Sequence, residues 1–353
     1  MTYKETNLFM RKLILLYIAL TLSLSPMASY AAAKKSHKHA SSSAKATHAK
    51  FTNKKSNKYK LIKYKTNSQA SNRKVNLRLR AHKAEMVYAQ AYDGSGPLLL
   101  ASSKALVINQ LTGETIYAKN TNQSTPIASV TKLMTAMVML DAHLPMDDLL
   151  LIADEDVDYL KGTRSRLSVG TPLTRGELLQ LALMSSENRA AAALGRNYPG
   201  GLSAFIAAMN NKAEVLGMKS THFYDPTGLD SNNVSTAEDL VKMVNAAYRY
   251  PEIRQVTTTA SQEITLYGRE NPINFVNTNS LVRGGDWVIG LSKTGFINEA
   301  GRCLVMQAEI SGQPMIIVLL DSAGKQSRIG DANRIRKWIE YNDAGSLGEN
   351  VSG

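Results

Sequence analysis

The pattern of apolar and polar residues changes along the chain from β-type to helical and back. Residues 98–108 form a strongly apolar run, and after a turn at 111–113 the chain returns as residues 114–119, which predicts two strands. Apolar side chains then recur at helical spacing in residues 129–141 and predict a helix. The folded part therefore opens with strands and becomes helical near residue 129.

A long helical region separates these strands from a second β region. Helical spacing predicts helices at 175–195, interrupted at Ser185–Ser186, and at 202–216 and 236–249. We expect strands at 287–293, 302–310 and 315–321, and a closing amphipathic helix at 326–342 with Ile329, Ile335, Trp338 and Ile339 inward. This order predicts an α+β fold, with an antiparallel sheet flanked by helices plus a mainly helical subdomain. A site made from both parts would lie in the cleft between them.

The first 33 residues have the features of a secretory signal peptide. Arg11 and Lys12 precede an apolar run of 12 residues from 13 to 24, and Ala31 and Ala33 offer small-residue cleavage sites. A membrane span needs roughly 20 apolar residues, so this run predicts a cleaved signal rather than a permanent anchor. We therefore expect an exported protein.

Residues 34–84 contain the excess positive charge of this 353-residue chain. They include 16 Lys or Arg and no Asp or Glu, whereas the whole chain has a net charge of +13. Because large apolar residues are few there, we expect a disordered basic linker. It is either a plain solvated spacer or a segment in electrostatic contact with anionic envelope polymers or lipid headgroups; nucleic acid is not an expected partner of an exported chain. Residues 85–345 are the expected folded domain, and 346–353 a flexible C-terminus.

Cysteine and histidine usage restricts the chemistry. Cys303 is the only cysteine, so no internal disulfide is expected, and its apolar strand context predicts a buried structural thiol. The expected folded domain has only His143 and His222, which makes a His-based triad or a catalytic zinc site a weak interpretation. We expect no metal and no cofactor, and the sequence has no glycine-rich phosphate-binding motif.

Three short motifs in a fixed order carry the strongest chemical signal. They are Ser129-Val130-Thr131-Lys132, Ser186-Glu187-Asn188 and Lys293-Thr294-Gly295. The S-x-x-K spacing also starts at Ser42, Ser71 and Ser322, and S-x-N also starts at Ser231, so only K-T-G is unique. Two of the other S-x-x-K copies fall in the basic linker and the third in a turn context. Order and context therefore select the three motifs.

The motifs have the residue types of a serine acyl-transfer site. A hydroxyl needs a base, and Lys132 lies on the same helical face as Ser129. To act as a base, Lys132 needs a lowered pKa, which burial or a second cation such as Lys293 would produce. Lys293 and Thr294 can bind a carboxylate, and Gly295 allows close backbone approach. Ser186 can relay a proton and Asn188 can hold a carbonyl group. Each motif also has a plainer structural interpretation, namely a helix N-cap at Ser129, a helix-capping loop at Ser186-Glu187-Asn188 and a strand-end turn at Lys293-Thr294-Gly295.

Taken together, these motifs resemble those of the low-molecular-mass penicillin-binding proteins, over roughly residues 100–340. The resemblance implies a β-lactamase/transpeptidase-like fold and a D-alanyl-D-alanine peptidase of the bacterial periplasm that acts in cell-wall remodelling and cell shape. It implies that Ser129 forms the acyl-enzyme with Lys132 as base, and that Ser186 and Asn188 assist proton transfer and bind substrate. Lys293 and Thr294 would hold the substrate carboxylate, and the backbone N–H groups of Ser129 and Phe296 would form the oxyanion hole. β-Lactams would be trapped as esters.

Within this family the sequence favours the endopeptidase branch, which cuts peptidoglycan cross-links. Ser186-Glu187-Asn188-Arg189-Ala190 is similar to that branch, and only 58 residues follow Gly295. A carboxypeptidase that trims pentapeptide stems is the alternative, followed by a β-lactamase or a non-catalytic wall-binding module. Phe296-Ile297 departs from the family pattern, in which we expect Tyr or His and then Thr.

Overall fold

The computed structural model describes residues 92–349. The predicted signal peptide at 1–33 and the predicted basic linker at 34–84 lie outside the described residues, as do residues 85–91 of the expected domain and 350–353 of the expected C-terminus. Among the described residues, no helix combines the length and the apolar character needed to cross a bilayer.

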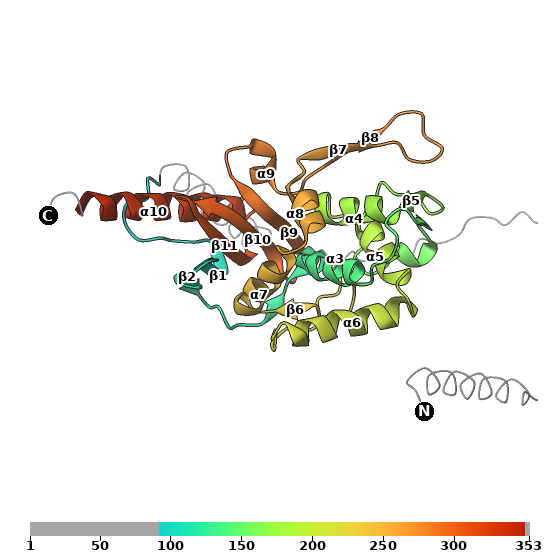
Figure 1. The fold of residues 1–353 in the computed structure, drawn as a ribbon, viewed down its shortest axis with the longest axis horizontal. Coiled ribbons are helices and arrows are strands. Elements are labelled where there is room, and N and C mark those ends of the chain that lie inside the picture. Colours follow the sequence, from blue (N-terminus) through green and yellow to red (C-terminus); the bar gives the residue numbers. More distant parts are fainter. Residues whose placement is uncertain (1–91, 350–353) are drawn as a thin grey trace, which may run out of the picture. The chain divides into compact units, whose positions relative to one another are not determined.

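A five-stranded antiparallel sheet forms the centre of the fold (Figure 1). Its strands follow the order β2-β1-β11-β10-β9, so that the first and last parts of the chain pair in the middle. Their bounds are β1 Ser102–Asn109, β2 Thr115–Lys119, β9 Ile289–Ile297, β10 Gly301–Ile310 and β11 Gln313–Ser322. Val107 lies opposite Ile317, and Val305 lies opposite Lys293. The predicted antiparallel sheet is confirmed.

Each face of this sheet packs against a different set of helices. Successive residues of a strand point to opposite faces, and on β11 Ile317 belongs to the core shared with helix α10 (Ser327–Glu349), whereas Ile316 belongs to the core of the helical part. Figure 1 shows α10 running along the sheet. Ile335 and Ile339 of α10 are buried there, and Ile329 and Trp338 pack against the same core. The α+β architecture is therefore the one that the apolar pattern predicts.

The helical part surrounds a buried central helix, α3 (Lys132–Asp141). The other helices are α4 Arg175–Met184, α5 Asn188–Arg196, α6 Gly201–Val215, α7 Ala237–Ala247, α8 Pro251–Thr258 and α9 Ser280–Gly284. Side-chain caps fix three of the helix starts. Thr174 and Glu177 form a capping box at α4, Thr236 accepts from the backbone of Asp239 at α7, and Asn279 accepts from the backbone of Leu281 at α9. The apolar periodicity predicted α3 to α7, but not the short α8 and α9.

Short paired strands complete the helical part. These pairs are β3 (Thr125–Pro126) with β6 (Val234–Ser235), β4 (Leu149–Leu151) with β5 (Pro172–Thr174), and β7 (Ser261–Ile264) with β8 (Ile273–Val276). None of them was expected from the sequence, because two to four residues carry too little periodicity to be recognised.

Of the element boundaries that differ from the prediction, two matter most. The strand expected at 287–293 runs to Ile297, so Lys293-Thr294-Gly295 lies inside β9 and not at a strand end. Pairing with β10 keeps the strand extended past Gly295, which faces Cys303. The last helix also continues beyond 342 to Glu349. It is anchored by Asp331, which accepts hydrogen bonds from the backbone of Ala101 and from the backbone and hydroxyl of Ser102.

Candidate active site

Ser129 and Lys132 meet at the junction of two helical elements. A 3-10 turn, η1 (Ala128–Thr131), leads directly into α3, which begins at Lys132. Side chains three residues apart are eclipsed in a 3-10 turn. The Lys132 Nζ atom accordingly lies 2.9 Å from the Ser129 Oγ atom. The structure thus brings together the predicted nucleophile and base, with Ser129 half-buried and Lys132 fully buried.

Two further acceptors determine where the lone pair of a neutral Lys132 points. The amine also donates to Asn188 Oδ1 at 2.7 Å and to the Thr227 carbonyl oxygen at 2.6 Å. Neither oxygen can donate a proton. A neutral amine has two N–H bonds for these two oxygens, so its lone pair faces the Ser129 hydroxyl, the one partner of the three that has a proton to give. This arrangement is that of a general base.

Burial is the main reason why Lys132 can be a neutral amine near pH 7. It lowers the pKa of Lys132 to about 7 from an ordinary 10.5, against the carboxylates of Asp225 and Glu187, which raise it. The sequence suggested burial beside a second cation, Lys293, and of these two causes removal from water is the leading one. The pKa of Lys293 is also held well below its ordinary value. Burial is the main cause, and the nearby positive charges of Lys132 and Arg328 add to it.

The turn at 223–229 supplies the Thr227 carbonyl, a contact that the sequence did not predict. Asp225 accepts from the backbone of Thr227 at 2.8 Å and of Gly228, which has φ +81°. A Cβ atom on Gly228 would lie 1.9 Å from the Ala128 carbonyl oxygen, so only glycine allows this turn to pack against η1. Asn233 fixes the turn further through the backbone of Tyr224. The sequence marked this stretch as turn-rich, but its contact with Lys132 depends on the tertiary fold.

Ser186 and Asn188 lie at the break between α4 and α5. Ser186 adopts a positive φ of 61° in the short break after α4, and α5 begins at Asn188. Lys293 Nζ donates to Ser186 Oγ at 2.9 Å. Because that oxygen accepts from Lys293, the Ser186 hydroxyl keeps its own proton available for a bound group. The predicted interruption of the helical pattern is confirmed at this position.

β9 forms the opposite wall of the site. Lys293 is buried and also donates to the Thr294 carbonyl oxygen at 3.0 Å, and the Thr294 hydroxyl donates to Thr278 Oγ1 at 2.7 Å. At Gly295 a Cβ atom would lie 2.9 Å from the Ile127 carbonyl oxygen and 3.0 Å from the Ser129 backbone nitrogen. Glycine therefore lets β9 approach Ser129 closely.

The residue after the K-T-G motif presents its side chain to solvent. Phe296 is 49% exposed, and the guanidinium of Arg302 lies 4.3 Å from the centre of its ring. Arg328 of α10 donates to the Gly295 carbonyl oxygen at 3.1 Å and so supports this part of β9. The oxyanion role of the Ser129 and Phe296 N–H groups stays a prediction.

Other sequence candidates have structural positions. Cys303 is fully buried, and burial raises the pKa of its thiol to about 11, as expected of an inert side chain. His222 is exposed and packs against the ring of Tyr224. In the second S-x-N copy, Asn233 is a buried support of the turn at 223–229. The S-x-x-K copies at Ser42 and Ser71 lie outside the described residues.

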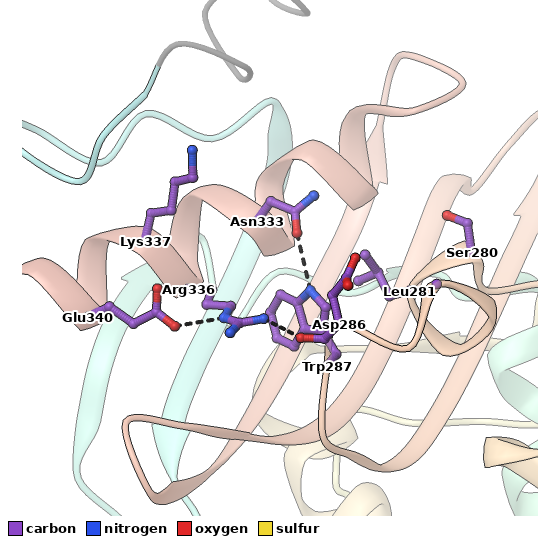
Figure 2. Close-up of a pocket in the computed structure, with 9 residues that line it drawn as sticks. Ser280, Leu281, Asp286, Trp287, Asn333, Arg336, Lys337 and Glu340 are labelled. Atoms are coloured by element: carbon purple, nitrogen blue, oxygen red, sulfur yellow. Dashed lines mark hydrogen bonds and ion pairs between the residues drawn. The ribbon is translucent and has the colours of Figure 1, made fainter.

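One cavity of about 220 Å³ adjoins the site and another of about 400 Å³ does not. Asn188 and Thr227 help to line the first, together with Asp158 and Leu160. The second lies between α9 and α10 (Figure 2). Several of its polar groups bond to one another: Trp287 donates to Asn333, and Arg336 donates to Glu340 and to the Asp286 carbonyl oxygen, as Figure 2 shows. We interpret it as a brace between α10 and the start of β9.

Comparison with known proteins agrees with this geometry. The model of the peptidase S11 family, described as D-alanyl-D-alanine carboxypeptidase, matches residues 88–324. Two relatives named D-alanyl-D-alanine endopeptidase, from Pseudomonas aeruginosa and Escherichia coli, are 49% and 47% identical over 241 residues, which cover 68% of this chain and 78% of each relative. The crystal structure of a Streptomyces DD-transpeptidase has a TM-score of 0.64 at 30% identity and covers 71% of this chain and 99% of that chain. The chain therefore belongs to the peptidase S11 family, and the resemblance to low-molecular-mass penicillin-binding proteins is confirmed.

Proposed function

We propose that this protein is a peptidoglycan D-alanyl-D-alanine endopeptidase that hydrolyses peptide cross-links through an acyl-enzyme on Ser129. The observation that carries the proposal is the Ser129 hydroxyl, 2.9 Å from a buried Lys132 whose other hydrogen-bond partners are acceptors only. The two relatives named endopeptidase support this specificity, because the chain spans 78% of each.

In the acylation step, neutral Lys132 takes the proton of the Ser129 hydroxyl as Oγ attacks the D-alanyl carbonyl carbon. The resulting ammonium finds three acceptors already in place, namely Ser129 Oγ, Asn188 Oδ1 and the Thr227 carbonyl oxygen. The oxyanion would bind the backbone N–H groups of Ser129 and Phe296. Removing one such donor typically costs about 2.7–4 kcal/mol of transition-state stabilisation.

The second half of the reaction releases the amino group of the neighbouring stem peptide. This nitrogen needs a proton as its bond to the carbonyl carbon breaks, and the Ser186 hydroxyl can deliver one because its oxygen accepts from Lys293. The proton that Lys132 took from Ser129 then replaces the one that Ser186 gave, which leaves Ser186 a hydroxyl and Lys132 a neutral amine. Water attacks the carbonyl carbon of the Ser129 ester and loses a proton to Lys132. Lys132 returns that proton to Oγ as the ester bond breaks, which regenerates the Ser129 hydroxyl and releases the carboxyl group of the cleaved peptide. The substrate carboxylate would be held by Lys293 and Thr294.

The same groups explain why β-lactams would act as covalent inhibitors. A β-lactam offers a carbonyl carbon for Ser129 and a carboxylate for Lys293, and opening its ring leaves an ester on the enzyme. Fast hydrolysis, as in a β-lactamase, would need a group that activates water. Glu187 is the nearby carboxylate in sequence, but it is buried and accepts from Ser165 at 2.6 Å and Arg166 at 3.2 Å. We therefore disfavour the β-lactamase alternative.

The test is incubation of the purified protein with cross-linked muropeptide dimers and with pentapeptide monomers, followed by mass spectrometry of the products. Ser129→Ala serves as the blank. We expect dimers to be converted to monomers. Loss of one D-alanine from pentapeptides, with dimers intact, would instead establish a carboxypeptidase. Activity that persists in Ser129→Ala would remove Ser129 from the nucleophile role.

We further propose that residues 1–33 direct export to the periplasm and that the basic segment 34–84 retains the protein at anionic envelope polymers or lipid headgroups. The support is the charge of the segment, with 16 Lys or Arg and no acidic residue. Mass spectrometry of the mature N-terminus tests export. Retention is tested by co-sedimentation of the protein with and without residues 34–84, once with sacculi and once with anionic lipid vesicles. Comparison of the two shows whether the segment binds envelope polymers or lipid headgroups. If that deletion abolished wall binding while Ser129→Ala left the cellular role unchanged, a wall-binding module would become the better interpretation.

A further inference from the structure

A chain of hydrogen bonds leads from the loop at 158–163 to the catalytic base. Thr163 donates to Asp158 Oδ2 through its hydroxyl at 2.6 Å and through its backbone at 2.8 Å. Asn188 Nδ2 donates to the Thr163 hydroxyl oxygen at 3.0 Å, and Lys132 Nζ donates to Asn188 Oδ1. The four side chains therefore form one connected series.

The series has a fixed direction. A carboxylate only accepts, so the proton of the Thr163 hydroxyl must point to Asp158. The Thr163 oxygen is then an acceptor toward Asn188, which places the NH₂ group of Asn188 on that side. The amide oxygen of Asn188 is consequently the atom that faces Lys132. Asp158 thus determines the amide orientation two hydrogen bonds away.

Asp158 is built to stay a carboxylate. Besides Thr163, its oxygens accept from the backbone N–H groups of Leu160 and Lys161, both at 2.9 Å. Partial burial would raise the pKa of Asp158, but these hydrogen bonds outweigh it and lower that pKa below its ordinary value. Lys161 also forms an ion pair with Glu299, between β9 and β10, at 2.5 Å. The loop is therefore held both to α5, through Asn188, and to the turn between β9 and β10, through Glu299.

We propose that Asp158 and Thr163 are positioning residues for acylation, which keep the Asn188 amide oxygen on Lys132. This inference rests on the proposed role of Lys132 as base. The Thr227 carbonyl cannot change its character, but an amide can rotate by half a turn. A rotated Asn188 would direct an N–H group at Lys132 and occupy the lone pair that Ser129 needs.

Solvent does not replace this function. Thr163 is exposed, so water can fill the place of its hydroxyl. Water, however, donates and accepts equally well, and it leaves both amide orientations open. Loss of the Thr163 hydroxyl should therefore remove an acceptor from the Lys132 ammonium in part of the molecules. The charged groups that face Lys132, namely Glu187, Asp225 and Lys293, remain unchanged.

The test compares Thr163→Val with Thr163→Ser in the whole protein. The readout is the second-order rate constant of labelling by a fluorescent penicillin between pH 5 and 9. We expect Thr163→Val to lower the rate constant at the high-pH plateau by about fivefold or more, the effect of one lost hydrogen bond. The acidic limb of its pH–rate profile, where the rate constant falls as Lys132 is protonated, should move to lower pH because the Lys132 ammonium has lost an acceptor. Thr163→Ser keeps the hydroxyl and should stay within about twofold of the parent.

Controls separate this inference from a folding defect and from the proposed function. Thr112→Val removes a hydroxyl that serves an exposed turn, where it accepts from the backbone of Glu114, and should label like the parent. Asp158→Asn can donate to Thr163 and should shift the acidic limb in the same direction as Thr163→Val, which gives a second variant if one fails to fold. An acidic limb at the parental pH in both variants would overturn the inference. Absence of labelling in the parent would instead overturn the acyl-enzyme itself.

Discussion

The lowered pKa of Lys132 makes a quantitative prediction about the pH dependence of acylation. A change from 10.5 to about 7 corresponds to roughly 5 kcal/mol of lost ammonium stability. At pH 7 about half of the Lys132 side chains would be neutral, compared with about one in 3,000 for an ordinary lysine. Burial in the fold therefore increases the population of active base by about three orders of magnitude.

Stopped-flow labelling with a fluorescent penicillin measures this effect. The rate constant should fall about tenfold per pH unit well below pH 7 and level off above it. Lys132→Ala should lose roughly 10²- to 10⁴-fold in rate at the plateau, the usual contribution of a general base. Ser129→Ala should not be labelled. A rate that still rises tenfold per unit up to pH 9 would show that Lys132 keeps an ordinary pKa and would refute the reasoning.

The same shift links stability to pH. The unfolded chain binds the Lys132 proton with a pKa near 10.5 and the native protein with one of about 7, so between these values the unfolded state holds more protons. The free energy of unfolding should therefore rise with pH through this window. Lys132→Met should reduce that slope in urea denaturation measured from pH 7 to 10. An unchanged slope would contradict the assigned pKa.

Three further predictions follow from packing. Gly295→Ala places a methyl group 3.0 Å from the Ser129 backbone nitrogen and should slow penicillin labelling on the order of 10²-fold, with the circular dichroism spectrum retained; normal labelling would refute the close approach of β9. Asp331→Ala leaves buried Arg334 without its ion-pair partner and should lower the free energy of unfolding by about 3–5 kcal/mol in urea; a change below 1 kcal/mol would contradict the anchor. Cys303, with a pKa of about 11, should react with a thiol reagent only after unfolding.

Local pattern was sufficient to locate the main elements of this protein and the residues that the fold brings together at the candidate site. Helical periodicity located α3 to α7, and apolar runs located β1, β9, β10 and β11, because the side chains that an element buries recur with its own period. The motif residues Ser129, Lys132 and Asn188 were identifiable because helical geometry brings residues three apart together and because the order of the motifs is informative.

Tertiary structure decided how those groups work. No property of residues 129–132 requires the pKa of Lys132 to fall; removal from water by the surrounding core does so. The Thr227 carbonyl lies 95 residues from Lys132 in sequence. Asp158 and Thr163 are connected to Lys132 through Asn188. A carbonyl oxygen exists at every residue, and Thr and Asp are common in loops, so their sequence carries no sign of these roles. Sequence by itself determined which groups are present and which elements carry them. Only the packing of distant segments decided which acceptors meet the amine and in which direction their hydrogen bonds run.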